Sequence, residues 1–168
     1  MARKKIVFVI VEGSSDETAL GVMLSQIYDK NKVHVQIMHG DITTRKGVRP
    51  DNIVAKVGAE VRKYARDNHY TSKHFQQIIH IVDTDGAYIP NENIILNLDQ
   101  DEITYEFDGI HTSDKQGIIE RNKQKTENLY RLRGTGQIWK VPVPNLLHLS
   151  SIPEPIFAKQ YSYCQSFF

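Results

Sequence analysis

The chain has 168 residues, 40% of them hydrophobic, so it is long enough for one domain with an ordinary core. Its 21 lysines and arginines against 20 acidic residues give a formal net charge of +1, so no global field indicates a nucleic-acid partner and any basic surface must be local. The single cysteine, Cys164, excludes an internal disulfide and a cysteine-rich zinc site and agrees with a reducing compartment.

The first predicted element is a buried strand at residues 6–10, Ile-Val-Phe-Val-Ile, of the kind found in parallel sheets covered on both faces. Glu12 follows too soon for this run to be the core of a signal peptide, and no other run could span a bilayer. We therefore expect a soluble, cytoplasmic protein with no membrane partner. Ser14 and Glu17 have the spacing of a capping box, which predicts a helix with an apolar stripe over residues 20–28.

Three more elements complete the first half of the chain. Residues 33–37 alternate as a second strand, and a polar, basic loop over 40–50 leads to a second helix over 53–65 capped by Asp51. A third strand follows at 75–82. This β-α-β-α-β order predicts an α/β fold, Rossmann-like and doubly wound, with a mainly parallel central sheet flanked by helices.

The second half of the chain has weaker patterns. Residues 87–134 are predicted to be an insertion that ends in a polar helix over 114–133, and residues 138–143 are predicted to form a fourth strand. The expected organisation is one domain over 4–144 that contains this insertion, followed by a C-terminal tail of unknown structure over 145–168.

Acidic residues follow the first and third predicted strands: Glu12 and Asp16 come after the first, and Asp83 and Asp85 after the third. The carboxyl ends of parallel strands share one edge of a sheet, so these four carboxylates would converge there. They would repel one another unless a cation lay among them, and hard oxygen ligands suit Mg²⁺ or Mn²⁺. Gly13 would let a phosphate approach the helix N-terminus. Together these features predict metal-dependent phosphoryl chemistry.

The alternative interpretation is structural. Asp16 and Glu17 would then only cap a helix, and Asp83 and Asp85 would only form a turn at Gly86, where the backbone can bend away.

These residues resemble the Toprim family, in which an apolar strand ends in Glu-Gly and a later strand ends in Asp-x-Asp. Ile10-Val11-Glu12-Gly13 and Ile81-Val82-Asp83-Thr84-Asp85 carry the resemblance, which covers residues 4–86 well and 137–144 loosely. It implies that Glu12 is a general acid/base or metal ligand and that Asp83 and Asp85 hold Mg²⁺.

Within that family, the chain is most similar to the nucleases of the overcoming-lysogenization-defect type. Asp16 matches the Glu-x-x-x-acid spacing of the nuclease branch. The resemblance implies a Mg²⁺-dependent enzyme that hydrolyses phosphodiester bonds of DNA or RNA. The nuclease branch usually adds a late acid and a lysine, for which Asp114 and Lys140 are available.

Basic residues could bind the substrate phosphates next to this acidic site. The candidates are Arg45, Lys46 and Arg49 in the loop after the second strand, together with Lys140. The bases of the polar helix, Arg121, Lys123, Lys125, Arg131 and Arg133, are a second candidate surface, and the alternative for both is a solvated face. Asp41 is expected to form a turn, although it could add a metal ligand. The seven histidines show no metal-ligand spacing.

Two other functions compete with the nuclease. Residues 81–86 also match the nucleophile loop of haloacid-dehalogenase-like phosphatases, in which Asp83 would be phosphorylated and Asp85 would be the acid/base. That motif normally opens its fold, and Glu12 would then have no role. A non-catalytic Toprim-like module that binds a protein partner in a larger assembly, or its own copies, is the third possibility, and absence of metal binding would distinguish it.

Overall fold

The computed structural model describes residues 4–12, 20–22, 24, 26–30, 32–83, 86–99, 101–143 and 146–149. For His39 and residues 146–149 the description covers the backbone alone. The chain divides into two compact units, the first formed by residues 1–82 and 128–148 and the second by residues 83–127 and 149–168.

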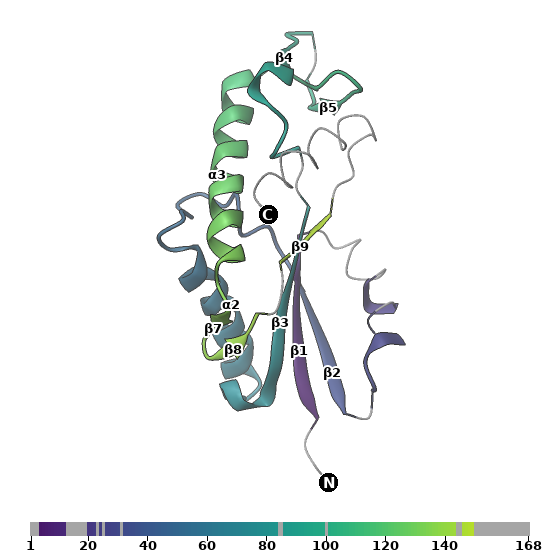
Figure 1. The fold of residues 1–168 in the computed structure, drawn as a ribbon, viewed down its shortest axis with the longest axis vertical. Helices are drawn as coiled ribbons and strands as arrows, with labels where there is room; N and C mark the ends of the chain where they lie inside the picture. Colours follow the sequence, from purple (N-terminus) through teal and green to yellow (C-terminus); the bar gives the residue numbers. More distant parts are fainter. Residues whose placement is uncertain are drawn as a thin grey trace. The chain divides into compact units, whose positions relative to one another are not determined.

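A four-stranded sheet in the order β2-β1-β3-β9 forms the centre of the first unit (Figure 1). Its strands are β1 (Lys5–Val11), β2 (Val33–His39), β3 (Phe75–Asp83) and β9 (Leu146–Leu149). β1 lies between β2 and β3 and is parallel to both, with Val9 opposite Ile37 on one side and Ile79 on the other. The three strands predicted in the first half of the chain are confirmed, as is the parallel arrangement of a mixed α/β fold.

Both faces of β1 are buried, which explains its continuous apolar sequence. Ile6, Phe8 and Ile10 pack on one face in a core that includes residues of α2 (Ile53–Asp67). The alternate residues, from Val7 to Val11, pack on the other face in a core that includes Leu24. Residues 20–22, 24, 26 and 27 are helical, in agreement with the predicted first helix, whose proposed cap at Ser14 lies outside the described residues.

The start of α2 differs from the prediction by one residue. Asn52, not Asp51, is the N-cap. The Asp51 carboxylate is instead paired with Arg49, with 3.2 Å between Nη2 and Oδ2. Asn52 Nδ2 donates to the carbonyl of Gly47, and its Oδ1 accepts the backbone N–H of Arg49, so this side chain stabilises the preceding loop.

The predicted fourth strand over 138–143 is wrong. β7 (Gln137–Ile138) and β8 (Val141–Pro142) pair antiparallel as a short hairpin. Trp139 and Lys140 form its two-residue turn with φ of 51° and 62°, a conformation that twists correctly for a tight hairpin. The Trp139 ring packs edge-on against Phe75, the first residue of β3, with ring centroids 5.8 Å apart.

The second unit has a small sheet in the order β4-β6-β5 and a core of four isoleucines, Ile89, Ile94, Ile110 and Ile118. Its strands are β4 (Ile94–Leu96), β5 (Thr104–Tyr105) and β6 (Ile110–Thr112), and two short 3₁₀ turns occur in the chain, η1 (Ser72–His74) before β3 and η2 (Asn91–Asn93) before β4. The predicted polar helix is confirmed as α3 (Lys115–Arg133), whose residues from Asn128 onward belong to the first unit.

Candidate functional site

Glu12 and Asp83 mark the carboxyl ends of two adjacent parallel strands. The last paired residues of β1 and β3 are Ile10 and His80. Glu12 comes directly after β1, and Asp83 is the final residue of β3. Both residues are half-buried. The strand topology therefore agrees with the predicted position of these two carboxylates at one edge of the sheet.

Three of the predicted site residues, Gly13, Asp16 and Asp85, lie outside the described residues. The turn predicted after the second acidic motif is confirmed, because Gly86 has a φ of 72° that favours glycine. Asn122 Nδ2, in α3, donates to the Gly86 carbonyl over 3.1 Å in a buried setting. This bond holds the backbone directly after the Asp-x-Asp segment.

A polar network surrounds Glu12 within the first unit. The hydroxyl of Thr43, a fully buried residue, lies 3.3 Å from Glu12 Oε1 and 2.9 Å from Asp41 Oδ1. Asp41 Oδ1 also accepts the backbone N–H groups of Thr43 and Thr44, at 2.8 Å and 3.2 Å, and the Thr44 hydroxyl donates to Oδ2. Asp41 thus forms the turn predicted for it, and this turn places the Thr43 hydroxyl against Glu12.

The loop that contains this turn is held from α3. Asn128, which is fully buried, donates through Nδ2 to the Thr43 carbonyl over 2.7 Å. The sequence analysis counted α3 as a polar helix with sparse apolar contacts and missed this face, on which Asn122, Lys125 and Asn128 are all buried. Lys125 is 0% exposed and is not part of a solvated basic surface, contrary to the prediction.

The predicted phosphate-binding residues have different environments. Arg45 Nη1 pairs with Glu60 at 3.2 Å, and Arg49 pairs with Asp51, whereas Lys46 is exposed and has no ion pair with any residue that the structure describes. These three bases follow β2, at the edge where Glu12 lies. Lys140 is next to Trp139, which contacts the amino end of β3, so the structure does not bring Lys140 to that edge.

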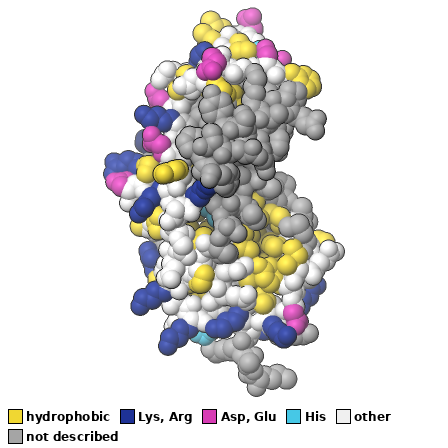
Figure 2. Space-filling model, in the orientation of Figure 1, with side chains coloured by type: hydrophobic (Ala, Val, Ile, Leu, Met, Phe, Trp, Pro, Cys, Tyr) yellow, Lys and Arg dark blue, Asp and Glu magenta, His cyan; other side chains and the backbone are white. Residues whose placement is uncertain are grey.

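The two units carry opposite charge, which the near-zero total conceals. The residues of the first unit include 16 lysines and arginines and 8 acids, a formal charge of +8. Those of the second unit include 5 lysines and arginines and 12 acids, a formal charge of −7. In Figure 2 basic side chains gather over the part that holds the strands of the large sheet and α2. The first unit therefore has the positive field that the whole-chain charge gave no reason to expect.

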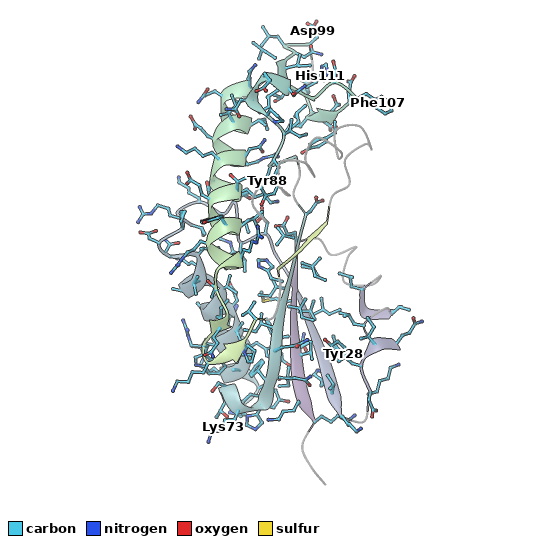
Figure 3. All side chains as sticks on the ribbon, in the orientation of Figure 1. Tyr28, Lys73, Tyr88, Asp99, Phe107 and His111 are labelled. Carbon is cyan, nitrogen blue, oxygen red and sulfur yellow. The ribbon has the colours of Figure 1, made fainter. Side chains whose placement is uncertain are left out.

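A second titratable cluster, which the sequence analysis missed, lies on the β5–β6 hairpin (Figure 3). One ligand atom from each of Glu106, Asp108 and His111 lies within 4.8 Å of the others. His111 Nε2 is 2.9 Å from Asp108 Oδ1 and 4.0 Å from Glu106 Oε2. The hydrogen bond with Asp108 raises the pKa of His111, and the same bond lowers the pKa of Asp108.

The hairpin turn fixes the spacing of this cluster. The backbone N–H of Glu106 donates to the Gly109 carbonyl over 2.9 Å, and a Cβ on Gly109 would lie 1.9 Å from the Asn93 carbonyl oxygen. The signal in the sequence is a Glu-x-Asp-x-x-His spacing around a glycine. One nitrogen and two carboxylate oxygens could hold a divalent ion, but both acids are exposed and nothing beyond proximity indicates a ligand.

A scan against models of protein families, a search of curated proteins and a search of solved structures found no match to this chain. Among the described residues, no helix is both long and apolar enough to cross a membrane. The function must therefore be argued from the residues themselves.

Proposed function

We propose that the chain is a Mg²⁺- or Mn²⁺-dependent nuclease with a Rossmann-like Toprim fold, acting on DNA or RNA in the cytoplasm. The observation that carries the proposal is the position of Glu12 and Asp83 at the carboxyl ends of adjacent parallel strands. Sites of open α/β sheets lie at that edge. Opposed charges on the two units add support, because the +8 of the first unit would attract a phosphate backbone.

The donor set fits a hard divalent cation. The predicted ligands Glu12, Asp16, Asp83 and Asp85 offer carboxylate oxygens, without the thiolate or imidazole that softer metals prefer. When bound, such a cation would stabilise negative charge on the transferring phosphate and lower the pKa of an attacking water.

The protein's own residues would do the rest. Glu12, half-buried and hydrogen-bonded to Thr43, would accept or return a proton as general acid/base. Lys46, exposed in the loop after β2, would bind substrate phosphate by charge alone, whereas Arg45 and Arg49 would first have to leave Glu60 and Asp51.

The deciding experiment incubates the protein with labelled single- and double-stranded DNA and RNA in Mg²⁺, Mn²⁺ or EDTA. We expect cleavage that requires the metal, is abolished by Asp83→Asn, and falls by on the order of 10²-fold or more in Glu12→Gln. Asp67→Asn is the control, because it removes the same charge from the exposed end of α2.

The same variants separate the competing functions. A haloacid-dehalogenase-like phosphatase would tolerate Glu12→Gln and form a phosphorylated Asp83 that mass spectrometry detects. A binding module would bind nucleic acid or protein without cleavage in any metal. Equal cleavage by the wild type and Asp83→Asn across a Mg²⁺ titration would refute the nuclease site.

A further inference from the structure

The Thr43 hydroxyl is shared between two carboxylates. It lies within hydrogen-bond distance of both Glu12 Oε1 and Asp41 Oδ1, at 3.3 Å and 2.9 Å, and Thr43 is 0% exposed. A hydroxyl has one proton to donate but can also accept. At any moment it therefore donates to Glu12 or to Asp41, never to both.

We propose that Thr43 is a positioning residue that keeps Glu12 in place in both of its protonation states. This inference rests on the proposed role of Glu12 as general acid/base. When Glu12 is ionised, the Thr43 hydroxyl donates to it. When Glu12 has taken up a proton from the reacting water, its own O–H donates to Thr43 Oγ1, and the Thr43 hydroxyl turns to donate to Asp41. Thr43 gains and loses no proton in this exchange.

Asp41 is built to tolerate both arrangements. Its carboxylate accepts the backbone N–H groups of Thr43 and Thr44 and the hydroxyl of Thr44, so it remains hydrogen-bonded when the Thr43 hydroxyl turns to Glu12. Without these donors, Asp41 would compete for the Thr43 proton, and Glu12 would lose its partner whenever it is ionised.

The rest of the loop is fixed, which leaves rotation of the hydroxyl as the only movement required. Asn128, also 0% exposed, donates to the Thr43 carbonyl over 2.7 Å, and the Asp41 turn restrains the same residue through its backbone N–H. A side chain held at both its N–H and its carbonyl keeps its hydroxyl at the same place while the proton changes direction.

The test compares Thr43→Val, which has nearly the same shape but no hydroxyl, with Thr43→Ser, which retains it. Thr43→Val should lower kcat by roughly 10- to 100-fold with little change in KM, because a misplaced acid/base slows the chemical step. Loss of the donor to the ionised Glu12 should also move the acidic limb of the pH profile of kcat to higher pH. Thr43→Ser should restore most of the rate and the wild-type limb.

Thr44→Val is the matched control, since it removes a hydrogen bond of Asp41 without touching Glu12. Whatever rate it loses should come without a shift of the pH limb. Thermal melts of all three variants show whether each remains folded, and Thr43→Ser still tests the proposal if Thr43→Val does not fold.

A double variant distinguishes failure of this inference from failure of the proposed function. In the Glu12→Gln background, Thr43→Val should change kcat by less than about twofold, because there is no carboxylate left to position. If Glu12→Gln itself cleaves as fast as the wild type, the proposed function is wrong. If Glu12→Gln is slow but Thr43→Val is not, or if Thr43→Val and Thr43→Ser lose the same rate without a pH shift, only the positioning role is overturned.

Discussion

Two lysines on the outer face of α2 should matter more for nucleic-acid binding than two lysines of the second unit. Lys56 and Lys63 are exposed, have no ion pair with any described residue, and belong to the unit of charge +8. Lys115 and Lys123, on α3, belong to the unit of charge −7. The two double Lys→Gln variants change the net charge and the helix propensity equally, so any difference in binding reports the location of the charge.

The magnitude follows from the number of phosphates that α2 would no longer neutralise. Lys56 and Lys63 are seven residues apart, about 10.5 Å along the helix, far enough to bind different phosphates. Each phosphate of a duplex that is no longer neutralised should lower the slope of log K against log salt by about 0.9, so the slope for the α2 variant should fall by about 1.8. At 0.1 M salt this corresponds to weaker binding by on the order of 60-fold.

The assay is fluorescence anisotropy of a labelled duplex between about 50 and about 200 mM KCl, a range over which counterion release dominates. The Asp83→Asn background keeps the substrate intact. The Lys115 and Lys123 variant should bind as tightly as its parent or tighter. Equal weakening in the two variants would show that only net charge matters, and unchanged slopes in both would make the outer face of α2 a solvated surface.

Two predictions concern the β5–β6 hairpin. Gly109→Ala should lower the free energy of unfolding by about 1 to 3 kcal/mol, because its Cβ would overlap the Asn93 carbonyl, whereas Gly136→Ala, which meets nothing within 4 Å, should have little effect in the same urea titration. NMR titration should give His111 a pKa above its ordinary 6.5 that falls in Asp108→Asn, with no fall contradicting the pairing. Because the His111 pKa is raised and the Asp108 pKa is lowered, the pair should stabilise the hairpin most between pH 3.8 and 6.5, losing this contribution as pH rises through the raised pKa or falls through the lowered one.

The strands of the large sheet could be predicted because their signal is local. β1 and β3 are apolar along their whole length, since both of their faces are buried, and glycine and acidic residues end the runs. The hairpin of β7 and β8 could not, because Trp139 and Lys140 occupy positive-φ positions where Asn-Gly would have been the recognisable signal. β4, β5 and β6 have two or three residues each, too few for any periodicity.

The opposite charges of the units were hidden for a different reason. Residues 128–148 return to the first unit after the second unit has been formed from 83–127, so the units are interleaved in the sequence. A sum over the whole chain cancels their charges, and a sum over consecutive residues divides them at the wrong places. Of the candidate site, Glu12 and Asp83 were predictable because strand ends converge by topology, whereas Thr43 was not, because its role depends on hydrogen bonds across 31 and 85 residues of sequence.

The buried polar residues of α3 show why helical periodicity alone misplaced that face. Asn122 and Asn128 occupy buried positions, where a helix that packs on strands would carry aliphatic residues. Each of them donates its amide to the carbonyl of a loop residue, Gly86 and Thr43 respectively. Strand carbonyls are satisfied by neighbouring strands, but a buried loop carbonyl needs a donor from elsewhere. A buried asparagine in a helix therefore indicates that a loop, not a strand, packs there, and in this chain both of those loops follow strands at the edge where the catalytic carboxylates are proposed.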